Sequence, residues 1–439
     1  MTNPNPSAGL LERLFKLSEN KTTFRTEILA GLTTFLTMCY IIIVNPLILS
    51  ETGMDHGAVF VATCLAAAIG CLVMGVVANY PIALAPGMGL NAYFTYSVCL
   101  GMGVEWQTAL AAVFVSGLVF IAISMFKIRE AIVNAIPISL KFAIGGGIGL
   151  FLALVALKNS GIIVANQATL VGLGDLKQPT VLLTLFGFFL TVIMHHYKVR
   201  GAIIISILAV TGIATALGLN EFKGVVGTIP SIAPTFMQMN FENLFSASLV
   251  GVIFVFFLVD LFDSTGTLVG VSHRAGLLKD GKLPRLKKAL FADSTAIVAG
   301  AALGTSSTTP YIESSAGVAA GGRTGLTAVV VGLLFLACLF LAPLAQSVPG
   351  FATAPALLFV GVLMIQGITN IEWDDITEAV PAFLTIVFMP FAYSIADGIA
   401  MGFISYALVK LFTGKAKTVP YMVWIIAVLW VIKFVAFGG

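Results

Sequence analysis

The chain has 439 residues, of which 59% are hydrophobic and only 10% are charged. Soluble domains carry about 25% charged residues, so this composition excludes an ordinary soluble enzyme and gives no reason to expect a nucleic acid partner. It predicts an all-α, multi-pass protein of the lipid bilayer. The formal net charge of +3 says little by itself, because the placement of Lys and Arg carries the topological information.

The five cysteines all lie in apolar stretches, without the spacing of metal ligands. They are predicted to be small buried hydrophobic residues, so neither a disulfide nor a metal site is expected. Residues 1–24 are polar and then weakly amphipathic, which predicts an N-terminal segment on the cytoplasmic surface.

Apolar runs of about 17–25 residues mark membrane spans, and fourteen such segments are predicted. They lie near 26–49, 57–79, 84–100, 107–126, 138–158, 180–196, 200–218, 247–269, 286–303, 309–321, 324–345, 353–369, 376–391 and 394–411. One more apolar run, 419–436, is predicted to be either a fifteenth span or a helix at the membrane interface.

Basic residues predict the orientation of these segments. They precede the first segment and follow the fourth, sixth, eighth, tenth and fourteenth segments, which are all loops on one side. Because cytoplasmic loops are enriched in Lys and Arg, that side is predicted to be the cytoplasm, and the N-terminus with it.

Fourteen segments divide into two repeats of seven, and a repeat with an odd number of spans must be inverted in the membrane. Pro137 is followed by Gly149, and Pro349 is followed at the same spacing by Gly361. The short third segment, interrupted by Pro86, corresponds in order to the short tenth segment. The shared order of these matches favours an inverted repeat.

The stretch 304–322 combines Pro310, Glu313 and many Ser, Thr and Gly residues between two hydrophobic segments. Non-helical backbone at membrane depth is tolerated only where protein or a water-filled cavity satisfies its polar groups. An ionisable residue in such a place indicates a functional site, although a polar loop outside the membrane remains the alternative. The stretch 83–94 is broken in a similar way, so two helix N-termini with free N–H groups would face each other.

Two carboxylates, Asp260 and Asp263, lie three residues apart in the eighth segment and so on roughly the same helical face. A charge at the bilayer centre costs at least about 2.5–3.5 kcal/mol, which favours a functional role. Such a group can hold a proton and release it when the cavity is hydrated. A structural hydrogen-bonding role remains the alternative for Asp260, and an interhelical hydrogen bond remains the alternative for Asn91.

At these residues the chain resembles the azaguanine-type purine permeases, a branch of the nucleobase–cation symporter-2 (nucleobase–ascorbate) superfamily. The resemblance covers essentially the whole chain. It is carried by the segments 26–46, 83–94, 261–278 and 304–329.

The resemblance implies a fold of seven plus seven inverted segments in two domains. The core, substrate-binding domain would comprise 25–126 and 247–345, and the gate domain 130–220 and 349–412. The run 419–436 would be an additional C-terminal hydrophobic helix. The third and tenth segments would each hold a short strand and a half-helix, with the substrate between them.

The resemblance also implies a function: proton-coupled import of purine nucleobases across the bacterial cytoplasmic (inner) membrane by alternating access. The proton gradient would drive transport without a cofactor, no enzymatic activity is expected, and the carrier would be a homodimer. Adenine is favoured over hypoxanthine and guanine. Substrate contacts are expected from Asp263, Glu313, Asn91, Tyr311, Phe94, Gly87, Leu90, Ile312 and Ser314. The coupled proton is assigned to Asp263, Glu313 or Asp260.

Two other functions compete with this one. An anion carrier of the same architecture would use the facing helix N-termini, but Asp263 and Glu313 would repel an anion unless both were protonated. An intramembrane aspartyl enzyme needs two carboxylates on different helices, and the pair in the eighth segment is poorly placed for that.

Overall fold

The computed structural model describes residues 9–125, 136–242, 244, 246–277 and 283–437. In this part of the chain, nine helices are long and apolar enough to cross a membrane, and three shorter apolar helices accompany them. The chain is therefore a multi-pass membrane protein, and the all-α class predicted from the composition is confirmed. The basic residues Lys127, Arg129, Lys279 and Lys282, on which the predicted orientation partly depends, lie outside the described residues.

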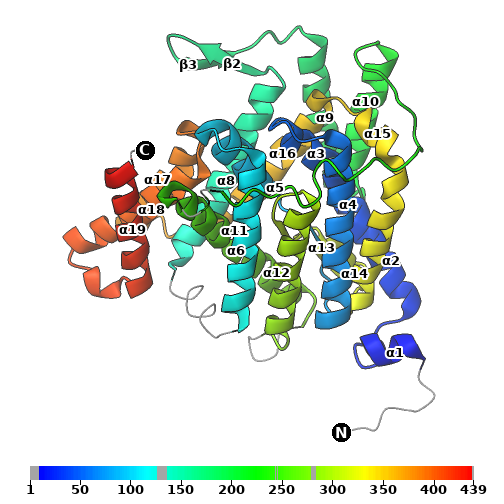
Figure 1. The fold of residues 1–439 in the computed structure, drawn as a ribbon, viewed down its shortest axis with the longest axis horizontal. Coiled ribbons are helices and arrows are strands. Elements are labelled where there is room, and N and C mark those ends of the chain that lie inside the picture. The colour runs from blue at the N-terminus through cyan, green and yellow to red at the C-terminus, as the bar shows by residue number, and fades with distance from the viewer. Residues whose placement is uncertain (1–8, 126–135, 243, 245, 278–282, 438–439) are drawn as a thin grey trace.

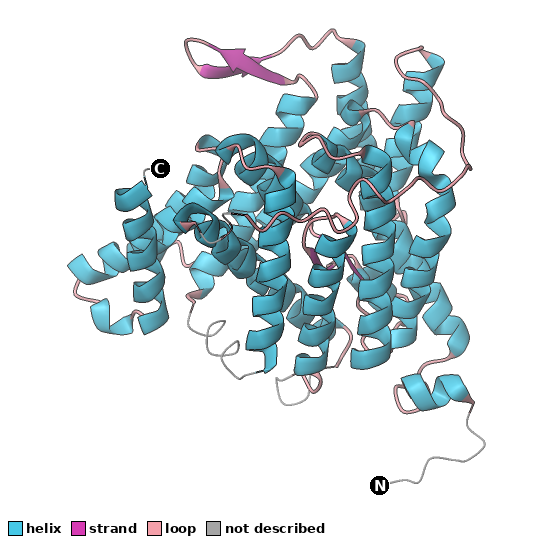
Figure 2. Cartoon of the chain, in the orientation of Figure 1, coloured by secondary structure: helices cyan, strands magenta, loops and turns pink. Residues whose placement is uncertain are grey.

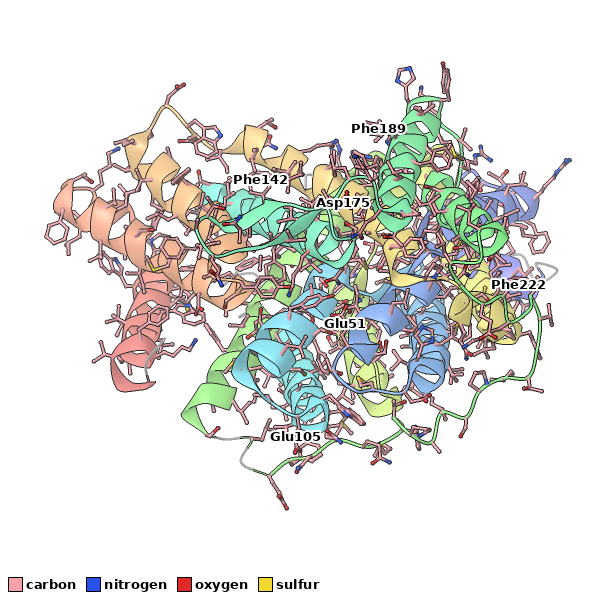
Figure 3. The ribbon with its side chains drawn as sticks, turned by 90° about the horizontal axis from the view of Figure 1, so that it is seen from above. Glu51, Glu105, Phe142, Asp175, Phe189 and Phe222 are labelled. Carbon is pink, nitrogen blue, oxygen red and sulfur yellow. The ribbon has the colours of Figure 1, made fainter. Side chains whose placement is uncertain are left out.

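The helices run between two ends of the molecule (Figure 1). We call the end with α1 (Leu10–Phe15) the N-terminal end. The opposite end carries the hairpin of β2 (Ile163–Asn166) and β3 (Leu170–Leu173), and we call it the hairpin end. Viewed from the hairpin end, the orange and red helices near the C-terminus form one side of the molecule (Figure 3).

The elements of the first repeat correspond to the seven predicted segments. They are α2 (Phe24–Met38), α3 (Ile41–Ser50), α4 (His56–Val73), η1 (Met74–Ala78), β1 (Leu84–Pro86), α5 (Met88–Ala92), η2 (Tyr93–Gly101), α6 (Trp106–Met125), α8 (Ile138–Asn159), α9 (Pro179–His196) and α10 (Ala202–Ala216).

The second repeat has the same order of long helices around a broken segment. Its elements are α11 (Ala247–Arg274), α12 (Leu286–Leu303), β4 (Thr308–Pro310), α13 (Ser314–Ala319), α14 (Gly325–Ala337), η3 (Cys338–Leu341), α15 (Ala342–Gln346), α16 (Gly350–Ile365), η4 (Gln366–Asn370), α17 (Ile376–Phe391) and α18 (Ile395–Phe412). The short η5 (Ala416–Thr418) and α19 (Tyr421–Phe437) follow.

Two short strands lie among the helices, where the sequence breaks the third and tenth segments (Figure 2). β1 and β4 pair in antiparallel fashion, with Leu84 opposite Pro310 and Pro86 opposite Thr308. Each strand ends at one of these prolines, whose fixed φ and missing N–H suit the end of a short strand. A short helix follows each strand, which confirms the predicted arrangement of strand and half-helix.

The two glycines that mark the predicted repeat contact each other. A Cβ atom added to Gly149 in α8 would lie 2.8 Å from the carbonyl oxygen of Gly361 in α16, and one added to Gly361 would lie 2.7 Å from that of Gly149. Only residues without a side chain allow two backbones to approach this closely. Equivalent residues of two inverted repeats meet in this way near the axis that relates them.

The helices pack in two groups. In the first, which we call the core group, α4 packs against α3, α12 and α14, α6 packs against η2, α11 and α12, and α13 packs against α2 and α11. In the second, the gate group, α8 packs against α16 and α17, α17 packs against α18, and α9 packs against α10 and α16. The domain boundaries expected from the sequence stay predictions, and the residues 126 and 130 at two of them lie outside the described part.

The C-terminal helix α19 packs along α18 and also contacts α11. Val423, Ile426 and Trp430 are buried at helical spacing, whereas Val428 and Val435 on its other side are exposed. Near its end, Lys433 Nζ lies 3.6 Å from a carboxylate oxygen of Asp397, which is in the first turn of α18. The helix α19 therefore runs antiparallel to α18, and whether it spans the membrane stays a prediction.

Candidate functional site

A cavity of about 90 Å³ lies between the two broken segments, where β1 and β4 meet the helix α11. Its walls come from both repeats and from both helix groups. Its lining residues are Tyr40, Gly87, Met88, Gly89, Asp263, Thr267, Thr309, Pro310, Tyr311, Ile312, Glu313, Val360 and Met364. Of the residues predicted from the sequence, Asp263, Glu313, Tyr311, Ile312 and Gly87 thus line one cavity.

Glu313 occupies the N-cap position of α13, and its backbone carbonyl accepts a hydrogen bond from the N–H of Ala316. Its side chain does not cap the helix. Instead Oε1 accepts a 2.8 Å hydrogen bond from the hydroxyl of Tyr40, which lies between α2 and α3. The carboxylate is therefore held at the cavity by a donor from the other repeat.

Asp263 projects from the middle of α11 into the same cavity, and the side chain of Thr309 in β4 is its hydrogen-bond partner. The Thr309 side chain also lies close to Gly87, where an added Cβ would be 2.8 Å from its hydroxyl oxygen. The strand pairing thus brings one hydroxyl, one carboxylate and an unshielded stretch of backbone together.

Asp260, one helical turn away, does not line the cavity. It is 1% exposed, and its carboxylate accepts hydrogen bonds of 3.3 Å from the hydroxyls of Ser264 and Ser307. Ser307 directly precedes β4, so Asp260 anchors the start of that strand to α11.

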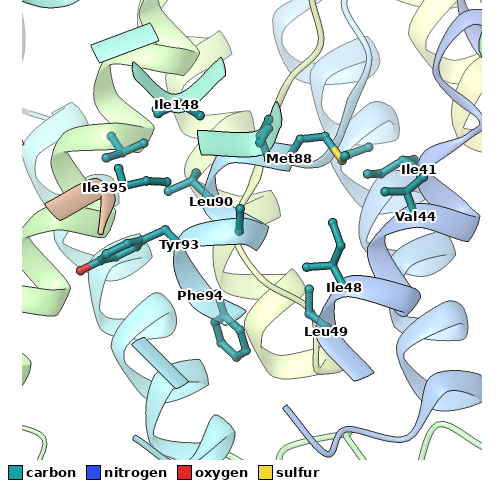
Figure 4. Packing of buried hydrophobic residues seen from close by; sticks show 14 of the residues in the cluster. Ile41, Val44, Ile48, Leu49, Met88, Leu90, Tyr93, Phe94, Ile148 and Ile395 are labelled. Carbon is teal, nitrogen blue, oxygen red and sulfur yellow. The ribbon is translucent and has the colours of Figure 1, made fainter. Parts of the chain in front are cut away.

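Four other predicted residues lie behind the cavity wall. Leu90 and Phe94 belong to a hydrophobic cluster (Figure 4), and the Phe94 ring lies 6.5 Å from that of Phe256. The amide oxygen of Asn91 accepts a hydrogen bond from the Ser306 hydroxyl, whereas its buried amide nitrogen has no hydrogen-bond partner among the described residues.

The fourth of these residues, Ser314, is fully buried, and its hydroxyl oxygen accepts a 3.0 Å hydrogen bond from the N–H of Ala83. Tyr311 does line the cavity, and its hydroxyl donates a 2.5 Å hydrogen bond to the carbonyl of Pro86. Both contacts join the third segment to the tenth and so fix the distance between the two walls.

A wide vestibule of about 670 Å³ adjoins the cavity, and the two share Asp263, Thr267, Ile312 and Met364. Its walls are mainly the first half of α8 and the second half of α11. Among the described residues of its lining, Lys141 near the start of α8 is the basic one. The cavity is therefore open toward the side of the molecule where α8 begins and α11 ends.

The sequence did not single out Tyr40, Thr267, Thr309, Met88 or Met364 as candidate site residues. Tyr40 lies inside an apolar run, where an aromatic residue is ordinarily a packing residue. The sequence also did not single out a buried acid that lies outside the cavity. Glu27 is fully buried in α2, and its carboxylate accepts hydrogen bonds from the N–H groups of Arg323, Thr324 and Thr327 at 2.9–3.3 Å.

The inverted repeat, the two helix groups and the cavity between two broken segments define a secondary transporter of the seven-plus-seven class. Among solved structures, the fold is similar to the transmembrane domain of the cyanobacterial bicarbonate transporter BicA. The TM-score is 0.63 at 17% identity, over 85% of this chain and 96% of that one. This likeness establishes the fold alone.

Residues 25–401 match the family described as the permease family, and the chain belongs to it. It is 49% identical to the adenine permease AdeP of Escherichia coli, over 99% of this chain and 98% of the relative. It is 48% identical to the guanine/hypoxanthine permease PbuG of Bacillus subtilis, over 97% and 99%. The resemblance to purine permeases noted in the sequence is confirmed, and the chain is a transporter rather than an enzyme.

Proposed function

We propose that this protein imports purine nucleobases, adenine first among them, together with protons. It does so by alternating access in the bacterial inner membrane, with the N-terminal end in the cytoplasm. Two full-length relatives are an adenine permease and a guanine/hypoxanthine permease. The resemblance to the purine permeases also implies a homodimer, and we include this in the proposal.

The single observation that carries the proposal is the pair of carboxylates, Asp263 and Glu313, at one cavity inside the membrane region. None of the described residues that line this cavity is Lys or Arg. Glu313 is half-buried and Asp263 is exposed toward the vestibule, and a carboxylate at membrane depth is stabilised where N–H donors, water or a proton compensate its charge. A purine base supplies several N–H donors on a flat frame, and a coupled proton supplies the remaining compensation.

The geometry supports binding of the purine base from two sides of the cavity. Glu313 would accept N–H donors from one edge of the base, while Tyr40 orients its carboxylate. Asp263 would bind a second edge or carry the proton. Gly87 and Gly89 leave the backbone of the third segment open to the ligand, and the Tyr311 ring, tied to the carbonyl of Pro86, would form a flat wall.

Leu90, Asn91, Phe94 and Ser314 support this site from behind in our proposal, because they contact the protein rather than the cavity. Asp260 is bound by two serine hydroxyls, so we assign the proton to Asp263 or Glu313. A proton bound together with the base halves the negative charge of the two carboxylates, which eases movement of the loaded site through a low-dielectric region.

The two helix groups support a mechanism in which the core group moves against the gate group. The cavity is lined by Asp263 and Glu313 of the core group and by Val360 and Met364 in α16 of the gate group. Relative movement of the groups would therefore open and close the site. The vestibule beside α8 and α11 corresponds to the open cytoplasmic side.

An anion carrier has less support. The similar fold of a bicarbonate transporter does not identify a substrate, and two carboxylates at the cavity repel an anion. Lys141, the basic residue among the described residues of the vestibule lining, does not line the cavity itself.

The choice among purines rests on the sequence resemblance alone, because relatives named for adenine and for guanine and hypoxanthine are almost equally similar to this chain. These bases share size and shape, and they differ in the order of donors and acceptors along one edge. A single side chain can therefore change the preference.

Uptake of labelled adenine into cells that lack purine permeases tests the proposal. We expect uptake that is faster at low external pH, that a protonophore abolishes and that excess unlabelled purines compete away. Competition by hypoxanthine and guanine ranks the bases, while uracil and sulfate serve as controls. If protein present in the membrane takes up no purine, or if sulfate competes as well as adenine does, the proposal is wrong.

A further inference from the structure

A second set of polar contacts lies at the hairpin end, where the core and gate groups meet. Glu51 follows α3, and Tyr96 lies in the third segment, so both belong to the core group. Asn159 is the last residue of α8 in the gate group. Glu51 lies near the middle of the molecule when it is viewed from this end (Figure 3).

The three side chains form a closed triangle of hydrogen bonds. The Tyr96 hydroxyl donates to Oε1 of Glu51 at 2.7 Å. The amide nitrogen of Asn159 donates to the same oxygen at 3.1 Å and approaches the Tyr96 hydroxyl oxygen at 3.1 Å. Two of the three bonds therefore cross between the helix groups, and both depend on Asn159.

Aromatic contacts reinforce the same crossing. The Tyr96 ring lies 6.1 Å from that of Tyr393, which is in the loop between α17 and α18 of the gate group. Lys158 Nζ lies 4.9 Å from the centre of the Tyr393 ring and 3.4 Å from its hydroxyl oxygen. Tyr96 is only 2% exposed, whereas Glu51 and Asn159 are exposed, and all three side chains line one opening.

That opening is a crevice of about 310 Å³ between the two groups. The core group lines one wall with Leu47, Ile48, Glu51 and Tyr96, and the gate group lines the other with Asn159 and the start of α16. The crevice and the central cavity share no lining residue among those described. The same helix, α16, lines both spaces, with Ala354 and Leu357 in the crevice and Val360 and Met364 in the cavity.

We propose that Glu51, Tyr96 and Asn159 form a latch that closes the outer mouth of the transport pathway, and that release of Asn159 allows the outward-open state. This inference rests on the alternating access of the proposed function. In the structure the vestibule connects the cavity to the proposed cytoplasmic side, whereas the crevice on the opposite side ends at the latch. This is the arrangement of an inward-open carrier.

The expected strength of these hydrogen bonds suits a contact that forms and breaks in every transport cycle. A net hydrogen bond shifts a two-state equilibrium by roughly two- to twelvefold. One or two such bonds bias the carrier toward the inward-open state, yet they break within the normal cycle. A carrier that spends most of its time closed to the outside binds external substrate less tightly, in proportion to the fraction that is open.

Cysteine accessibility tests the latch without any substrate. Val360→Cys places a thiol in the central cavity, and the five natural cysteines are all buried, so the parent protein supplies the background rate. A membrane-impermeant maleimide is applied to intact cells and, separately, to inside-out vesicles. Asn159→Ala removes both crossing bonds, and Tyr96→Phe removes one while it keeps the ring.

The matched control is Ser50→Ala, next to Glu51, because the Ser50 hydroxyl donates only to the carbonyl of Leu47 in its own helix. With Asn159→Ala and Tyr96→Phe we expect external labelling of Val360→Cys to rise roughly three- to tenfold, and labelling in inside-out vesicles to fall. Ser50→Ala should change neither rate.

Equal external labelling in all three variants would overturn the latch, and so would a rise on both sides, which indicates a loosened protein. Adenine uptake by the unmodified protein, measured in parallel, separates this result from a failure of the proposed function. Labelling reports the latch even if no purine is carried. Adenine uptake by the unmodified protein, without any change of labelling in the latch variants, contradicts the latch and leaves the proposed function standing.

Discussion

The hydroxyl of Tyr40 donates a 2.8 Å hydrogen bond to Oε1 of Glu313, across 273 positions of sequence. Tyr40 lies where the first segment bends between α2 and α3, and Glu313 begins the half-helix of the tenth segment. This contact joins the two repeats at the cavity. It means that the acid proposed to bind the base is already oriented before the base arrives.

Removing this donor should weaken substrate binding. A hydrogen bond to a charged group contributes about 1.5–3 kcal/mol, so Tyr40→Phe should raise the KM for adenine uptake roughly tenfold or more. Binding of adenine to the purified protein should weaken in parallel. Tyr80→Phe is the matched control, because the Tyr80 hydroxyl only accepts a hydrogen bond from the backbone N–H of Arg285. Equal KM values in both variants would show that Tyr40 does not orient Glu313.

The two cavity carboxylates should differ in their effects. Glu313→Ala should abolish adenine binding, since it removes the acceptor for the base. Asp263→Asn should keep part of the binding but lose the dependence of uptake on external pH between pH 5.5 and 8. Binding is measured on purified protein, and uptake in cells with and without a protonophore.

Asp260→Asn is the control for the previous experiment, because Asp260 lies on the same helix but outside the cavity lining. It should retain the pH dependence, even if less protein reaches the membrane. Full pH-dependent uptake by both Glu313→Ala and Asp263→Asn would rule out the assigned roles.

The positions of the helices were predictable because the thickness of a bilayer sets the length of an apolar run. The predicted run 376–391 coincides with α17, and the breaks at Pro86 and Pro310 coincide with β1 and β4. Hydropathy and the clustering of proline with glycine or with polar residues are local properties, so a single sequence reveals them.

The shape of the site was harder to predict. Asp263 and Glu313 lie 50 positions apart, and only tertiary packing brings them to one cavity. Phe94 turns into the core because the third segment continues as a π-helix after Ala92, which changes the face that each residue presents. Tyr40 gave no signal, since its role depends on a partner in the other repeat.

The buried Glu27 should be a stability residue rather than a transport residue. Its carboxylate accepts hydrogen bonds from the N–H groups of Thr324 and Thr327 and from the Thr327 hydroxyl, so it supports the first turn of α14, whose N-cap residue is Thr324. Glu27→Ala leaves these donors buried without an acceptor, which costs about 1–3 kcal/mol for each group that water does not reach. We expect a clearly lower thermal unfolding midpoint in detergent.

Glu27→Gln keeps one acceptor oxygen and should lose less stability than Glu27→Ala. Glu19→Gln is the surface control: Glu19 pairs with Lys16 at 3.1 Å, but both side chains are largely exposed, so no measurable change is expected. If Glu27→Ala unfolds at the same temperature as Glu19→Gln, the hydrogen bonds of the Glu27 carboxylate do not stabilise the protein.

A second stability prediction concerns the closest backbone approach in the core group. A Cβ atom added to Gly325, the first residue of α14, would lie 1.9 Å from the carbonyl oxygen of Gly75 in η1. Backbone cannot yield as a flexible side chain does, so Gly325→Ala must push α14 away from η1. Overpacking of this kind costs about 1–3 kcal/mol or more.

Gly212→Ala in α10 is the matched control, because nothing lies within 4 Å of its added Cβ. Alanine also favours a helix interior by up to about 1 kcal/mol over glycine, so Gly212→Ala should unfold at the same or a slightly higher temperature. Thermal unfolding of the purified variants should therefore show a lower midpoint for Gly325→Ala only, and a Gly325→Ala midpoint at or above that of the parent protein would contradict the close approach of α14 and η1.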